Sequence, residues 1–115
     1  MAPNSLSDEE RVDNLVKKYG FDFIKISKSE IRGLIEKEIE NYQDGSSEYI
    51  RVLCGYLFCI GDYEDAELIE RAKYNINFDV GCMIDGDWIE ALKGNMSEED
   101  KQVHIQAFIK YYENI

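Results

Sequence analysis

The sequence predicts an all-α protein, a compact bundle of five or six short helices in antiparallel helix-turn-helix pairs. Apolar residues recur at helical spacing along most of the chain. Serine or aspartate residues suited to capping precede these segments, and glycines follow several of them. The chain has 115 residues, of which 44% are hydrophobic, enough for one core without disulfides or metal ions. We therefore expect a single domain over residues 1–115.

The segment from Tyr49 to Ile60, YIRVLCGYLFCI, predicts the central helix. It is apolar almost all the way round, whereas its neighbours are apolar on one face only, and a helix of that kind belongs in the interior. We expect Ser47 to cap this helix and Gly61 to end it. The expected core combines this helix with later apolar positions: Val52, Leu53, Tyr56, Leu57, Ile60, Leu68, Ile69 and Trp88.

Two helices are expected before the central one. The first covers Ser7–Tyr19, where Ser7 and Glu10 form a capping box. The second follows a cap at Ser27 or Ser29, and its apolar residues fall at helical spacing between positions 31 and 42. The intervening FDFIKI, residues 21–26, could form a short strand. Because no second strand-like segment is available to pair with it, we favour an apolar linker packed on the bundle.

The second half of the chain predicts three further elements. Asp62 is a suitable cap for a helix that runs to about Tyr74. Glycines then divide residues 75–94 into a loop, which contains Phe78 and Cys82, and a short helix that carries Trp88. The last helix begins at Ser97 and runs to the C-terminus.

Charge is the strongest compositional signal. The chain holds 24 acidic and 13 basic residues, a formal net charge of −11. Residues 62–100 hold 12 acids and 3 bases, so nearly all the excess lies in about a third of the chain. Direct binding to nucleic acid is not expected, because phosphates would be repelled. An acidic surface can also serve solubility alone, which is the competing interpretation.

Catalytic and metal-binding patterns are weak, so we expect neither an enzyme nor a cofactor. His104 falls on the apolar side of the last helix beside Phe108 and Tyr111, where a core or half-buried imidazole is favoured over a catalytic base. The three cysteines are expected as free thiols, because two lie inside the apolar helix. Asp85 and Asp87 show too little of a calcium-loop pattern to predict a metal site.

The stretch YLFCIGDYEDAELIERAKYNINFDVGCMID resembles the HEAT-like α-helical repeat proteins of bacteria. The shared pattern is an apolar helix, a Gly-Asp corner with an acidic cap, an amphipathic helix that ends in Ala-Lys, a loop with Phe-Asp and a Cys-x-Ile-Asp-like turn. The resemblance covers residues 49–92. Small domains of this kind look like immunity proteins, and the resemblance therefore implies a protein that neutralises a bacterial toxin, most simply a nuclease, by direct binding.

Three function hypotheses follow: an acidic immunity protein, a helical adaptor module, and a phage-type inhibitor of a nucleic-acid-binding complex. The first and third require a basic protein partner, drawn in by charge steering. No small-molecule substrate is expected. The N-terminus shows no signal peptide or membrane anchor, so a cytoplasmic protein without membrane contact is expected. The expected partner-binding residues are Asp62, Tyr63, Glu64, Glu67, Glu70, Tyr74, Asp85, Asp87, Glu98 and Glu99.

Overall fold

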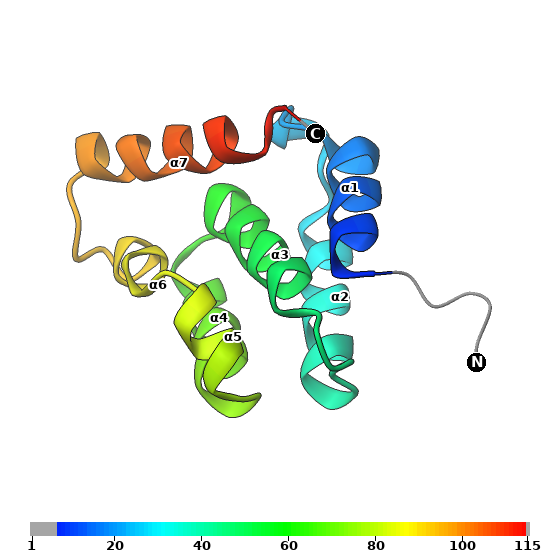
Figure 1. Ribbon diagram of the computed structural model, residues 1–115. Helices are drawn as coiled ribbons and strands as arrows, with labels where there is room; N and C mark the ends of the chain where they lie inside the picture. Colours follow the sequence, from blue (N-terminus) through cyan, green and yellow to red (C-terminus); the bar gives the residue numbers. More distant parts are fainter. Residues whose placement is uncertain (1–6, 115) are drawn as a thin grey trace.

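Seven α-helices and two single-turn 3-10 helices, with no strand, form the part of the chain that the computed structural model describes, residues 7–114 (Figure 1). The prediction that the N-terminus has no signal peptide or membrane anchor depends partly on residues 1–6, which lie outside this range. In chain order the elements are α1 (Asp8–Tyr19), η1 (Phe23–Lys25), α2 (Lys28–Glu40), α3 (Ser47–Ile60), η2 (Tyr63–Asp65), α4 (Ala66–Asn75), α5 (Phe78–Met83), α6 (Gly86–Leu92) and α7 (Glu98–Tyr112).

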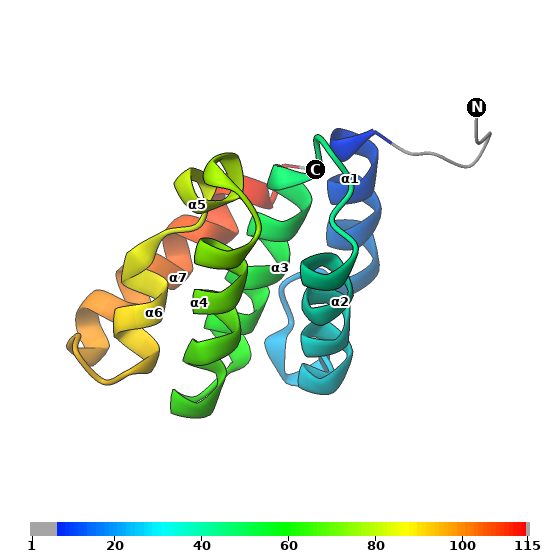
Figure 2. The same ribbon diagram turned by 90° about the horizontal axis from the view of Figure 1, so that it is seen from below.

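Helix α3 is the centre of the fold, as its sequence predicts. Six other helices contact it: α1, α2, α4, α5, α6 and α7. Figure 2 shows α1, α2, α3 and α4 running in alternating directions, which is the expected antiparallel pairing. All the expected core residues are buried except Ile60, which is only partly buried because it lies at the last turn of α3. The Cα radius of gyration is 13.6 Å, close to that of a compact domain of this length.

Local capping signals explain where most helices begin. Ser7, Ser27 and Ser97 each accept a hydrogen bond from the backbone N–H three residues later. The prediction that Ser47 caps α3 is wrong. Asp8 of α1 accepts from the N–H groups of Glu48 and Tyr49, at 3.0 and 2.8 Å, so the start of the central helix is capped by another helix.

Aromatic packing joins α7 to α3. The Phe108 ring lies 5.5 Å from Tyr56 and 5.9 Å from Trp88, centroid to centroid, in edge-to-face arrangements. Phe108 approaches α3 directly over Gly55, and a Cβ placed on that glycine would overlap the ring. A residue without a side chain is therefore required at position 55 for α7 to pack this closely.

Two segments differ from their predictions. The loop expected around Phe78 contains α5, and Asn77 caps it by accepting from the Val80 N–H at 2.9 Å. Residues 21–26 form no strand, as expected, but include the η1 turn. Ile26 of this linker is buried, whereas Ile24, within the η1 turn, is 96% exposed, so the expected packing of the linker holds only in part. No helix within residues 7–114 is long and apolar enough to cross a membrane.

Substituting Gly55 of α3 and Gly33 of α2 by alanine should change stability in opposite directions. Gly55→Ala should cost about 1–3 kcal/mol, because the buried Phe108 ring cannot move aside and this overlap outweighs the better helix propensity of alanine. Gly33 lies in α2, and no neighbouring atom lies within 4 Å of the methyl group that alanine would add, so Gly33→Ala should stabilise by about 0.5–1 kcal/mol. Urea denaturation of both variants tests this. Equal shifts of the same sign would mean that Phe108 does not pack on Gly55.

Candidate functional site

Four of the expected partner-binding residues surround one hollow between η2, α4 and the end of α6. The hollow has a volume of about 320 Å³ and includes Tyr63, Glu64, Glu67 and Glu70 in its lining. Lys93 also lines it, and its ammonium lies 3.1 Å from the Glu70 carboxylate. This ion pair raises the pKa of Lys93, chiefly through the hydrogen bond to Glu70. Glu67 makes no ion pair within residues 7–114, so its charge is uncompensated.

The carboxylates of the turn before α4 form ion pairs with two basic side chains of α2. The Lys28 ammonium lies 3.5, 3.3 and 3.1 Å from carboxylate oxygens of Asp62, Glu64 and Asp65. Asp65 also pairs with Arg32 at 2.6 Å, and its side chain is only 1% exposed. An acid at this position, directly before α4, is favourable beside the positive helix end. Asp65 is also buried, and its ion pairs join α2 to α4.

The pKa of Asp65 reflects this environment. Burial alone would raise it, but the Asp62 backbone N–H at 2.7 Å and the ion pairs with Lys28 and Arg32 outweigh burial and lower the pKa below its usual value of 3.8. Asp65 therefore stays ionised at neutral pH. Its role is to hold two helices together, and its charge is not available to a partner.

The two tyrosines of the expected surface are both well exposed but lie at opposite ends of α4. Tyr63 is 71% exposed beside the glutamate hollow. Tyr74 is 69% exposed and lies with Phe78 and Cys82 along a different hollow, between α4 and α5. Phe78 is 83% exposed and was not among the expected partner-binding residues. The sequence did not indicate that Phe78 is exposed, because it lies in a segment expected to be a loop, where no helical pattern shows which residues face outward.

Asp85 and Asp87 lie around His104 rather than beside α4. Asp85 is 3.9 Å from His104 Nδ1, and Asp87 is 3.6 Å from Nε2. Ligand atoms of the three residues lie within 4.8 Å of one another, which a divalent cation could accept. The two carboxylates face different ring nitrogens, and both distances are too long for a hydrogen bond, so the three residues form a loose polar cluster. His104 is half-buried, as expected.

Glu98 and Glu99 form a third group, at the start of α7. Both are exposed, and neither makes an ion pair within residues 7–114. They contribute favourable charge beside the positive helix end. The ten expected residues therefore form three groups: the surroundings of η2 and α4, the His104 cluster, and the first turn of α7.

Residues from both ends of the described chain line a further acidic cleft, which the sequence did not predict. It has a volume of about 480 Å³ between α1, α3 and α7. Tyr111, expected on the apolar side of α7, borders it and is 65% exposed. Glu9 and Asp13 line it without an ion pair among the described residues. These residues come from segments about 100 positions apart, so no local pattern could have placed them together.

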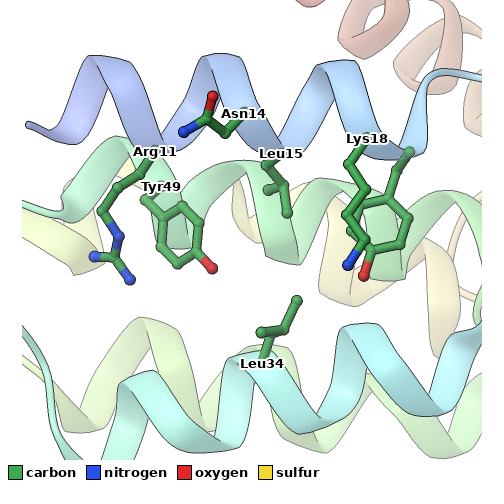
Figure 3. A pocket seen from close by; sticks show the side chains of 7 residues that line it. Arg11, Asn14, Leu15, Lys18, Leu34 and Tyr49 are labelled. Atoms are coloured by element: carbon green, nitrogen blue, oxygen red, sulfur yellow. The ribbon is translucent and has the colours of Figure 1, made fainter. Parts of the chain in front are cut away.

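Helices α1, α2 and α3 border a hollow of a different character, shown in Figure 3. Leu15 and Leu34 face each other across it, and Tyr49 lies to one side of them, next to Arg11. Its volume is about 250 Å³. The residues that line it include two cations and no carboxylate: Arg11, Asn14, Leu15, Lys18, Tyr19, Leu34 and Tyr49. We refer to it as the leucine hollow.

The cysteines are free thiols, as expected. Cys54 is buried in α3, and burial raises the pKa of its thiol far above the usual value. Burial likewise raises the pKa of Cys59 to about 12. Both thiols therefore stay protonated at neutral pH and are poor nucleophiles. They act as small apolar side chains of the central helix.

Comparison with protein-family models, curated proteins and solved structures finds no match to this chain. The structure supports the coarser part of the resemblance, a small all-α protein of paired helices. Its link to HEAT-like immunity proteins depends on the sequence pattern of residues 49–92.

Replacing Asp65 by asparagine should lower stability at neutral pH and flatten its acid dependence. Because the folded-state pKa of Asp65 lies below 3.8, its ionised form contributes stability above that pH, and the contribution is lost as the pH falls through the folded-state value. Asp65→Asn should cost about 1–3 kcal/mol at pH 7, with the difference from wild type shrinking below pH 3.8.

Asp62→Asn is the matched control, since Asp62 faces the same Lys28 but its side chain is 78% exposed. This change should cost about 0–1 kcal/mol. Urea denaturation from pH 7 to pH 3 measures both variants. If the Asp65→Asn difference did not depend on pH, the ion pairs would not be what stabilises this junction.

Proposed function

We propose that this chain is an acidic inhibitor that neutralises a basic protein partner by direct binding. An immunity protein against a bacterial nuclease toxin is the form that the resemblance favours. The observation that carries the proposal is the charge of residues 62–100, net −9, in which Glu67, Glu98 and Glu99 remain uncompensated after internal ion pairing. Such carboxylates can occupy the positions that nucleic-acid phosphates would take on a nuclease.

Exposed aromatic side chains beside these acids support the same proposal. Tyr63 borders the hollow that contains Glu67, and Tyr74 lies at the other end of α4. A tyrosine contributes rigid, amphipathic contact area of the kind found at interface hot spots. The surrounding carboxylates would steer a basic partner toward this surface and raise the association rate by about 10- to 1000-fold at low salt.

A helical adaptor is the second candidate, and the leucine hollow favours it, because apolar hollows between helices accept side chains of ordinary protein partners. A phage-type inhibitor of a nucleic-acid-binding complex would use the same acidic surface as an immunity protein. Salt separates the adaptor from the other two, since screening weakens a charge-steered complex much more than an apolar one.

The partner can be identified by affinity capture from the native host at low and high salt, followed by mass spectrometry. The acidic-inhibitor proposal expects a basic protein whose capture falls at high salt, and whose activity is inhibited when the two purified proteins are mixed. An acidic or neutral partner that is captured equally at both salt concentrations would support the adaptor instead.

Reversing two charges on α4 should weaken this complex. Glu67→Lys with Glu70→Lys replaces one uncompensated and one paired glutamate. We expect association with the captured partner to slow by about tenfold or more, with the melting temperature little changed. Surface plasmon resonance at low and high salt measures both rates.

The matched control is Glu36→Lys with Glu40→Lys on α2. This pair also contains one glutamate with an ion-pair partner, Arg71, and one without any among the described residues. The control should bind almost as wild type. If the control variant associated slowly and the α4 variant associated as wild type does, the interface would lie on α2 instead.

A further inference from the structure

The leucine hollow combines an apolar centre with a cationic end. Leu15 and Leu34 approach it from α1 and α2, and Figure 3 shows their side chains directed at each other across the space. The ring of Tyr49, from α3, forms the wall beside them, next to Arg11. An apolar group placed here would be in contact with three helices, and its removal from water would favour binding.

The charge of this hollow is opposite to that of the whole chain. None of the 24 acidic residues lines it, although two of the 13 basic residues do. Arg11 is committed within the protein: it pairs with Glu38 at 3.0 Å, donates to Ser46 and stacks 3.7 Å above the Tyr49 ring centroid. It therefore helps to build the wall of the hollow.

Lys18 is the cation that remains for a ligand. It makes no ion pair within residues 7–114, and its ammonium lies 5.2 Å from the centroid of the Tyr19 ring. Figure 3 places Lys18 at the end of the hollow opposite Arg11, with its amine directed toward the space between α1 and α2. Glu30, the nearby acid, accepts a hydrogen bond from the Tyr19 hydroxyl at 2.9 Å and does not line the hollow.

We propose that the leucine hollow binds a small carboxylic acid with a branched aliphatic group. The aliphatic group lies between Leu15 and Leu34 against Tyr49, and the carboxylate pairs with Lys18. The hollow is about 250 Å³, smaller than pockets for drug-sized ligands, so it has room for a small acid. This site is separate from the acidic surface of the proposed function and does not depend on it.

The probes are 4-methylpentanoate and its neutral amide, 4-methylpentanamide, added to the full chain and followed by ¹H–¹⁵N NMR. We expect the acid to shift the amide resonances of Leu15, Lys18, Leu34 and Tyr49, with a dissociation constant in the millimolar range expected for so small a ligand. The neutral amide should bind more weakly by about two- to fivefold, because it lacks the ion pair with Lys18.

Three variants assign the interaction to these side chains. Lys18→Gln should reduce acid binding to the level of the neutral amide and leave amide binding unchanged. Lys17→Gln is the matched control, since Lys17 is an exposed neighbour on α1 that does not line the hollow, and it should bind both probes as wild type does. Leu34→Ala, at a partly buried position, should weaken both probes.

The proposal is overturned if the acid binds no tighter than the amide, if the shifts map to residues outside the hollow, or if Lys17→Gln weakens binding as much as Lys18→Gln. A tripeptide that ends in leucine and binds more tightly than 4-methylpentanoate would overturn the assignment to a small acid and point to a polypeptide C-terminus. None of these outcomes bears on binding at the acidic surface.

Discussion

Burial of α3 on all sides is the constraint on which the rest of the structure depends. Its residues 52–58 are buried without interruption, so no face of this helix is left for water and the surrounding helices must cover it completely. Its polar groups then need partners from elsewhere in the chain. Asp8 accepts from the N–H groups at its first turn, and Arg51 donates to the Met83 carbonyl and the Tyr112 hydroxyl. These contacts tie the first and last helices to the centre.

Features encoded over a few residues could be predicted from the sequence, and features that depend on distant residues could not. Ser7, Ser27 and Ser97 and the apolar character of residues 49–60 act within one or two turns, so the sequence predicts these helices. The cap of α3 comes from Asp8, a distant residue, and is not predicted. Helix α5 is six residues long and contains Gly81, which disfavours helix locally. A residue of α4 stabilises α5 instead. The Lys73 ammonium donates hydrogen bonds to the carbonyls of Gly81 and Ile84, at 2.5 and 2.6 Å.

The acidic surface shows the same division. Tyr63, Glu67, Glu70 and Tyr74 follow one another at helical spacing, which predicts a shared face. The structure brings the first three around one hollow, whereas Tyr74 lies along another. Charge counting could not show which acids are neutralised internally. Lys28, more than 30 positions away in the sequence, faces the acids before α4, and Lys93 faces Glu70. The net charge of residues 62–100 therefore overstates the charge available to a partner, and unpaired acids such as Glu67, Glu98 and Glu99 carry part of what remains.

A strongly acidic protein can keep a cationic hollow because its charges are separated in space. Figure 2 shows α1 and α2 on one side of α3, and α4 and α6 on the other. The molecule is 47 Å long, whereas charges in physiological salt are screened over about 8 Å. Lys18 is therefore governed by its immediate surroundings rather than by the acids near α4. These surroundings hold leucine and tyrosine side chains and Glu30, which accepts a hydrogen bond from the Tyr19 hydroxyl. A basic protein at α4 and a small acid between α1 and α2 would be drawn by opposite local potentials, so both could be bound at once without competing.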